Sequence, residues 1–225
     1  MANDGGDWRK GHRARLREKF LDDKLTDCEL VELLLCQAIP RVDVKPVAKE
    51  LMKKFGSIQN IVAADTMELR RCAGVGEGAA VLFAAIKKFM LSAYRGELRD
   101  APLFYDTGRL YDYCRLLLSK VRVEEFHIFY LDADNRLIQD DLHTAGTKDH
   151  VAVYPREVLQ RAMALNARNV VLVHNHPDGT RSFSTDDIEL TQKIREKLAV
   201  DGIGVLDHLL VSDGLIFSAK NMFLI

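Results

Sequence analysis

The spacing of apolar residues changes near residue 100, and this change restricts the possible folds more than any other feature of the chain. From Trp8 to about Tyr94, apolar residues return every three or four positions, which is typical of amphipathic helices. From Phe126 onward, short β-rich runs alternate with helical patterns. The sequence therefore predicts a small all-α domain followed by an α/β domain.

Turn and capping residues set the expected boundaries of these parts. Thr26 followed by Glu29 predicts a capping box at a helix start, and Gly56 and Gly74 are expected helix stops. The expected elements of the second part are a strand at 126–131, a helix opened by Pro155, a strand at 170–173, a helix at 185–200, and strands at 204–211 and 215–217. We place the domains at 1–95 and 103–225, with a linker at 95–106.

Composition excludes several classes of protein. Hydrophobic residues make up 48% of the chain, but the longest apolar stretch, Ala79 to Ile86, is too short to span a bilayer. Residues 1–100 hold 18 Lys and Arg against 15 Asp and Glu, and the remainder holds 14 against 18. Bulk charge therefore cannot drive nucleic-acid binding, and any such contact should be local to the front half. The four cysteines lack paired short spacings, and we expect a cytoplasmic protein without membrane contact.

Two histidines at the end of an expected strand are the strongest chemical signal. His174-Asn175-His176-Pro177 follows the β-rich run at 170–173, and side chains two apart on a strand point to the same side. Asp187 falls in the first turn of the next expected helix. Two imidazoles and one carboxylate are a ligand set for zinc that leaves one position open. The sequence therefore predicts a zinc site at His174, His176 and Asp187.

The acidic residue of this set has two competing interpretations. Ser184 followed by Asp187 is also a capping-box pattern, and a carboxylate bound to zinc is not free to cap a helix. If Asp187 is the cap, Asp186 is the alternative ligand. A lone histidine at a strand end is usually structural, but the pair with Pro177 favours a metal site.

These residues resemble a known family. His-x-His-Pro, six residues, then Ser-x-x-Asp resembles the JAMM motif of the MPN metallopeptidase superfamily, and the whole chain resembles the bacterial RadC family. The matching segments are Val153-Tyr154-Pro155-Arg156-Glu157, His174 to Gly179, Leu206-Asp207-His208-Leu209, and Gly11 to Arg17. The resemblance implies a cytidine-deaminase-like MPN/JAMM fold, a mixed sheet with flanking helices, and Zn²⁺ as cofactor. Asp178 departs from the family, where Ser is common, and could offer a competing ligand.

The resemblance also implies catalytic residues. A glutamate on an upstream strand acts as general base in the superfamily, and the matching position is Glu124, with Glu125 as the neighbouring alternative. Alternation along a strand allows only one of them to reach the metal side. The motif serine falls on Ser184, a candidate partner for the developing oxyanion. The alternative is that both glutamates are solvated charges at a strand start.

Other histidines carry weaker predictions. His208 is either a partner of the site or, as we expect, an ordinary interior histidine. We find no partner from sequence for four others, His12, His127, His143 and His150. Arg156 is expected to be solvated.

The front domain has a feature of its own. Leu69 to Gly76 followed by Ala79 to Met90 resembles a helix-hairpin-helix, in which backbone N–H groups approach a DNA phosphate. The basic residues nearby or toward the N-terminus are Arg70, Arg71, Lys87, Lys88, Arg9, Lys10, Arg13, Arg15, Arg17 and Lys19. The alternative is a tight helix connection beside a solvated charged face.

The function expected from these patterns is a zinc-dependent metallopeptidase or related amide or isopeptide hydrolase. Its protein or peptide substrate is not specified by the sequence. One rival is a DNA-associated accessory protein, linked to repair or recombination, whose zinc is structural. A second is an enzyme acting on a nucleic-acid component, although no Cys-x-x-Cys of the deaminase signature is present.

Overall fold

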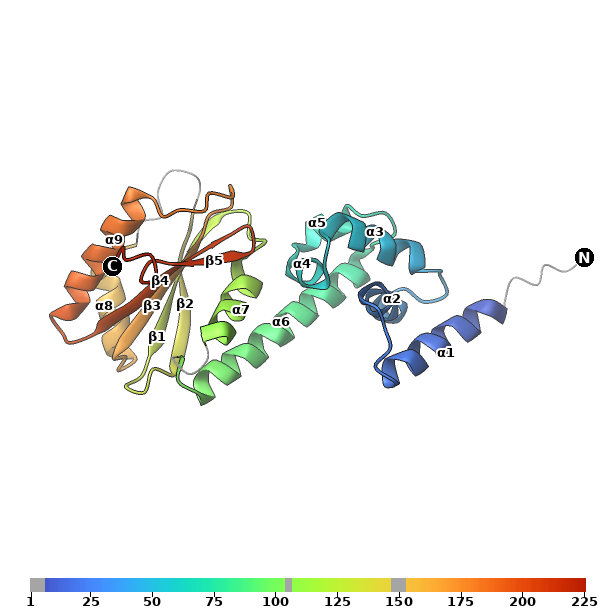
Figure 1. The fold of residues 1–225 in the computed structure, drawn as a ribbon, viewed down its shortest axis with the longest axis horizontal. Helices are drawn as coiled ribbons and strands as arrows, with labels where there is room; N and C mark the ends of the chain where they lie inside the picture. The colour runs from blue at the N-terminus through green and yellow to red at the C-terminus, as the bar shows by residue number, and fades with distance from the viewer. Residues whose placement is uncertain (1–6, 104–106, 147–152) are drawn as a thin grey trace, which may run out of the picture. The chain divides into compact units, whose positions relative to one another are not determined.

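The computed structural model describes residues 7–103, 107–146 and 153–225. These residues form two compact units, Met1–Lys88 and Phe89–Ile225. The helices of the first unit are α1 (Asp7–Leu21), α2 (Asp27–Ala38), α3 (Lys45–Phe55), α4 (Ile58–Ala63), α5 (Thr66–Arg70) and the first part of α6 (Glu77–Asp100). Figure 1 shows these elements along the chain.

The front unit is all-helical, as the sequence predicts, and capping residues determine where several of its helices begin and end. Thr26 accepts from the backbone N–H of Glu29, and the Glu29 side chain returns to Thr26, so the predicted capping box opens α2. Gly56 ends α3 with a φ of 79°, a conformation that glycine adopts without strain. Gly74 also has a positive φ, but α5 ends at Arg70 with Arg71 as its C-cap, so the helix stop predicted at Gly74 is wrong by three residues.

The second unit is a mixed α/β domain. Its further elements are α7 (Thr107–Leu118), β1 (Glu124–Leu131), β2 (Leu137–Gly146), α8 (Pro155–Ala164), β3 (Asn169–Asn175), α9 (Thr185–Ala199), β4 (Gly204–Ser212) and β5 (Leu215–Ser218). The five strands form one sheet in the order β2-β1-β3-β4-β5. β3 and β4 are parallel and the other neighbours are antiparallel. The predicted mixed sheet with flanking helices is confirmed.

Alternation along the strands divides the core into two layers. Ile128, Leu172 and their neighbours of the same parity pack with Val158 of α8 and Ile194 of α9. Phe129, Val173 and the other strand residues that point to the opposite face pack with residues of α7 such as Tyr113. In Figure 1, α8 and α9 accordingly lie on one side of the sheet and α7 on the other. This arrangement gives every strand residue a defined face.

Two elements were not predicted. The strand β2 reads Leu-Ile-Gln-Asp-Asp-Leu-His over residues 137–143, and as an edge strand it carries polar residues that hide the β pattern. α7 lies just after the expected linker. That linker, 95–106, is partly wrong, because Arg95 to Asp100 complete α6.

One ion-pair cluster holds the end of α6 to the sheet of the second unit. Arg95 donates to both carboxylate oxygens of Asp140, at 2.7 and 2.9 Å, and to the hydroxyl of Tyr113 at 2.8 Å. Tyr113 also donates to Asp140. The continuation of the helix past residue 95 therefore has specific polar contacts as well as helix propensity.

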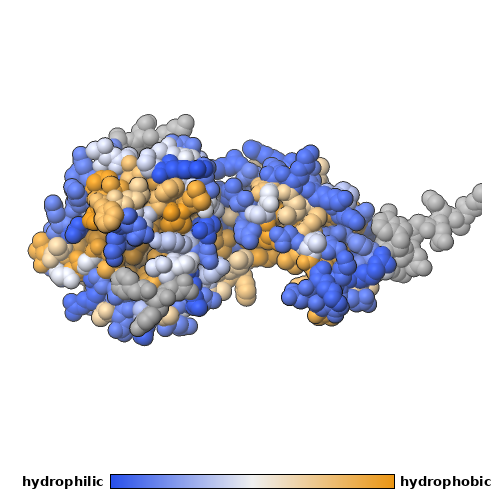
Figure 2. Space-filling view, viewed as in Figure 1, coloured by the Kyte–Doolittle hydropathy of each residue, from blue (hydrophilic) through white to orange (hydrophobic). Residues whose placement is uncertain are grey.

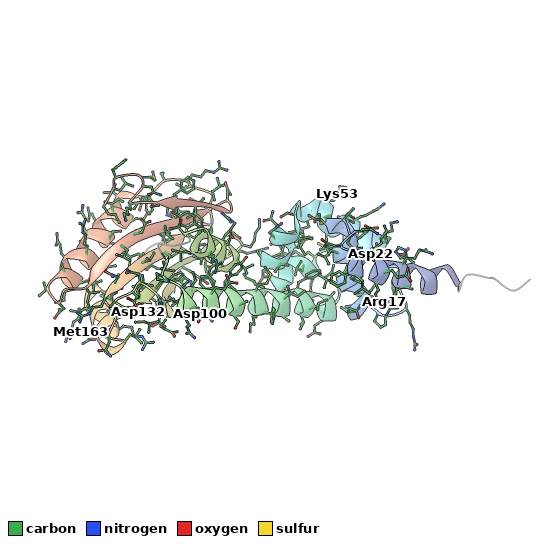
Figure 3. All side chains as sticks on the ribbon, turned by 60° about the horizontal axis from the view of Figure 1, so that its bottom comes forward. Arg17, Asp22, Lys53, Asp100, Asp132 and Met163 are labelled. Carbon is green, nitrogen blue, oxygen red and sulfur yellow. The ribbon has the colours of Figure 1, made fainter. Side chains whose placement is uncertain are left out.

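Surface residues follow the usual pattern. Figure 2 shows that hydrophilic residues cover most of the visible face of the front unit, and Figure 3 labels three of them, Arg17 on α1, Asp22 in the turn after it and Lys53 on α3. Within the residues described, no helix has the length and apolar character needed to cross a membrane.

Candidate metal centre

The end of β3 and the first turn of α9 bring three ligand-type side chains together. His174 is fully buried at the end of β3, and His176 follows just beyond it, with its N–H bonded to the carbonyl of Val211 on β4. Because β1 pairs Phe126 with His174, both histidines lie on the sheet face covered by α8 and α9. Asp187 projects from α9 onto the same face. These three residues form the one such cluster within the described parts of the chain.

The spacing of their ligand atoms is within about 0.2 Å of that around a tetrahedral zinc ion. The two imidazole Nε2 atoms are 3.1 Å apart, and the Asp187 oxygens lie 3.4 Å from His174 Nε2 and 3.5 Å from His176 Nε2. Ligands about 2.0–2.2 Å from a tetrahedral zinc are about 3.3–3.5 Å from one another. The Nδ1 atom of His176 donates to the carbonyl of Thr180 at 3.1 Å, so its Nε2 lone pair is free to bind. The donor set therefore fits Zn²⁺.

Asp187 caps its helix and faces the histidines at the same time. Its Oδ2 atom accepts from Ser184 N–H at 2.7 Å and from the Ser184 hydroxyl at 2.6 Å, which completes the capping box. Oδ1 faces His174. The two interpretations that compete in the sequence are thus compatible, because a carboxylate has two oxygens with several lone pairs. Asp186 is exposed and lies outside the cluster.

A buried hydrogen-bond chain behind the site determines which nitrogen of His174 is free. Thr191 is bonded at 2.6 Å to the main-chain oxygen of Asp187, so its hydroxyl donates there and accepts from His208 Nδ1, also at 2.6 Å. A neutral His208 then accepts at Nε2 from His174 Nδ1, at 2.8 Å. His174 is left with its lone pair on Nε2, the atom that faces His176 and Asp187. His208 is both a buried histidine and a partner of the site.

The close approach of these groups also shifts their pKa values, because an imidazole protonated at Nε2 would donate to Asp187. Burial alone would raise the pKa of Asp187, but hydrogen bonds from His174, His176 and Ser184 hold it well below its usual range. The hydrogen bond to Asp187 raises the pKa of His176, to which the charge of Glu124 also contributes. Burial lowers the pKa of His208 well below its ordinary value, which keeps the ring neutral.

The structure separates the two candidate bases. Phe126 pairs with His174, so Glu124, two residues earlier on the same side of β1, shares the sheet face of the histidines. Glu125 has the opposite parity, and its carboxylate binds His127 Nε2 at 2.9 Å. Glu124 is half-buried and is the glutamate on the sheet face that carries His174 and His176.

The remaining predicted residues have other surroundings. Asp178 is exposed, and its carboxylate accepts from the backbone N–H and hydroxyl of Thr180, both at 2.9 Å, so it organises the loop. Arg156 is exposed, as expected. His150 lies outside the described residues. Three of the histidines for which the sequence names no partner have one in the structure: His12 pairs with Glu32, His127 with Glu125, and His143 with Tyr130.

Several basic residues of the front unit have structural contacts. Arg13 donates to carbonyl oxygens at and after the end of α2. Lys19 pairs with Glu29 at 2.6 Å, and Lys87 donates to the carbonyl of Ala63 at 3.2 Å. The side chains of Arg9 and Lys10 lie outside the described part. The basic cluster expected from the sequence is therefore partly a set of helix-packing contacts.

Three residues of the site were not found from sequence. Thr191 lies four residues after Asp187, one helical turn along the same face, and this spacing was the available signal. Asn175 sits between the two histidines but points to the other face of the sheet. Phe183 packs its ring 5.7 Å from that of His174 and 5.1 Å from that of His208, and nothing in the local pattern predicts this contact.

Fold and site together define a class of protein. A mixed sheet with helices on both faces, and a histidine pair at a strand end facing a helix-capping aspartate, is the arrangement of a JAB-type (MPN) domain. A family model described as RadC-like JAB domain matches residues 104–223. The UPF0758 protein SPO0054 of Ruegeria pomeroyi is 38% identical over 214 residues, which cover 94% of this chain and 96% of the relative. The chain belongs to the RadC family.

Proposed function

We propose that this protein is a zinc-dependent hydrolase of amide or isopeptide bonds. The observation that carries the proposal is the convergence of His174 Nε2, His176 Nε2 and the Asp187 carboxylate at tetrahedral spacing, with Glu124 on the same face. A purely structural zinc is usually enclosed by four protein ligands. Three ligands beside a half-buried glutamate favour a catalytic role.

The chemistry assigns a separate task to each residue. Zinc, when bound, supplies Lewis acidity toward a carbonyl and lowers the pKa of water to about 7. Glu124 accepts a proton from the attacking water and delivers it to the leaving amine, a role worth on the order of 10²- to 10⁴-fold in rate. Ser184 orients Asp187 through its hydroxyl, whose single proton goes to the carboxylate. We propose that this proton turns to the substrate oxygen once the Asp187 carboxylate binds zinc. Phe126 and Phe183 flank His174 and limit the access of water to it.

Metal content and turnover test the proposal. Full-length wild type, His176→Ala, Glu124→Gln and Glu125→Gln are analysed for zinc by mass spectrometry and incubated with a mixed peptide and isopeptide library. We expect zinc in all but His176→Ala, and cleavage by wild type and Glu125→Gln only. Glu125 is the matched control, because it neighbours Glu124 on the opposite face. Folded wild type without zinc would contradict the metal site, and zinc without cleavage would contradict the hydrolase.

A second candidate function is sequence-independent contact with DNA through residues 1–95. Arg70 and Arg71 are exposed beside the exposed glycine loop that precedes α6, and these features favour the candidate. DNA binding should then weaken as salt rises and survive His174→Ala. Loss of DNA binding in Arg70→Ala/Arg71→Ala would support it, and no binding by wild type at low salt would exclude it.

A further inference from the structure

A buried asparagine stands between the two proposed histidine ligands in the sequence, and its side-chain amide bonds to another strand. Asn175 is 2% exposed and ends β3, on the face opposite to His174 and His176. Its Oδ1 atom accepts from the N–H of Glu125 at 2.9 Å. Its Nδ2 atom donates to the carbonyl of Val123 at 3.0 Å and of Val121 at 3.4 Å. These side-chain hydrogen bonds all go to the backbone at the start of β1 or in the three residues before it.

These contacts begin where the backbone ladder stops. The pairing of β1 with β3 runs from Leu131 to Phe126, which is opposite His174, and among the described residues this pairing goes no further. Beyond that point the Asn175 side chain replaces the ladder. It joins the two strands where they lead into the proposed metal site.

The contacted groups have a specific relation to Glu124. The carbonyl of Val123 belongs to the peptide bond before Glu124, and the N–H of Glu125 belongs to the peptide bond after it. The amide of Asn175 thus holds the two peptide planes that flank Glu124 and restricts its φ and ψ. Because the Asn175 amide is buried, leaving it without these hydrogen bonds would be unfavourable. The backbone on both sides of the proposed base is therefore held in place.

We infer that Asn175 is a positioning residue that directs the Glu124 side chain toward the ion held by its neighbours His174 and His176. The inference rests on the proposed role of Glu124 as base. It gives a reason for the opposite direction of the Asn175 side chain. The segment 174–176 then positions both the ion, through its two histidines, and the Glu124 carboxylate, through Asn175. A base displaced by about 1 Å loses on the order of 10²-fold in rate.

The test uses Co²⁺ as a spectroscopic probe in the full-length protein. The pH dependence of the cobalt absorption bands is recorded for wild type, Glu124→Gln, Asn175→Leu, Asn175→Asp and the double variant Glu124→Gln/Asn175→Leu. We expect Glu124→Gln to shift the midpoint, Asn175→Leu to reproduce most of that shift, and the double variant to show no further shift. Asn175→Asp keeps the acceptor but replaces the donor with a carboxylate oxygen that is repelled by the carbonyls of Val123 and Val121, so its midpoint should also depart from that of wild type.

A matched control lies at the other end of the same strand. Asn169 begins β3 and donates to Asn135 at 2.6 Å, remote from the site, so Asn169→Leu should leave the cobalt midpoint unchanged. A midpoint in both Asn175 variants equal to that of wild type, with Glu124→Gln shifted, would overturn the inference and leave the base intact. A Glu124→Gln variant that binds cobalt without any shift would overturn the base itself, and the inference with it.

Discussion

Thr191 should control metal affinity although it does not contact the ion. Its hydroxyl is 2.6 Å from both the Asp187 carbonyl and His208 Nδ1, and Thr191, His208 and His174 are all 0% exposed. In Thr191→Val the shape is kept but His208 Nδ1–H has no acceptor. An unsatisfied buried donor costs about 1–3 kcal/mol. The buried chain can avoid this cost only by rearranging its protons.

That rearrangement is what opposes metal binding. His208 can move its proton to Nε2, and His174 must then accept at Nδ1 and carry its own proton on Nε2. Without metal this state is favourable, because His174 Nε2–H can donate to His176 Nε2 at 3.1 Å. Binding zinc requires the original state again, so the variant binds more weakly. Partners of this kind typically contribute 10- to 100-fold, or about 1.4–2.7 kcal/mol.

Competition with a chromophoric chelator at neutral pH measures this effect. We expect the Kd for zinc to rise about 10- to 100-fold in Thr191→Val and to stay near the wild-type value in Thr191→Ser, which keeps the hydroxyl. Circular dichroism establishes that both variants are folded. A folded Thr191→Val protein with wild-type affinity would refute the proposed arrangement of protons along the Thr191, His208 and His174 chain.

Three further predictions concern stability. Zinc removal by a chelator should lower the free energy of unfolding of the second unit by about 2.7 kcal/mol relative to zinc at 100 times Kd, which calorimetry would record as a lower Tm. Asp140→Ala leaves Arg95 and Tyr113 without their acceptor and should cost about 3 kcal/mol in urea unfolding, and an unchanged midpoint would contradict this. Burial lowers the pKa of His143 below its ordinary 6.5. As pH falls, the unfolded chain therefore takes up a proton at this residue before the folded protein does. The stability that is present above about pH 6.5 is then lost below it. His143→Gln should reduce that loss, by at most about 1.4 kcal/mol per pH unit, and equal slopes from pH 7 to 5 would disprove the effect.

Much of the fold was predictable because it depends on local periodicity. The helices of the front unit, the strand before His174 and the helix that holds Asp187 all show the spacing of their own secondary structure. The strand β2 did not, because an edge strand contacts only one neighbour and tolerates Gln139, Asp140 and Asp141. The end of α6 was missed because Gly96 and Asp100 resemble loop residues. Arg95 holds this helix end to the sheet through residues more than ten positions away.

The residues of the candidate site also fall into those predicted by local pattern and those that depend on distant contacts. By itself the sequence determined the ligand types and their local directions, because two histidines two apart on a strand share a face, and an aspartate three residues after an N-cap lies in the first turn of a helix. Only the tertiary structure decided which glutamate shares the sheet face of the histidines, since that depends on the pairing of Phe126 with His174. It also decided that Thr191 and His208 lie behind His174 and that Asn175 binds the backbone around Glu124, because these hydrogen bonds join residues that are 17, 34 and 50 or more positions apart. Local patterns in a chain constrain local geometry, whereas hydrogen bonds between distant segments exist only once the sheet and helices have packed.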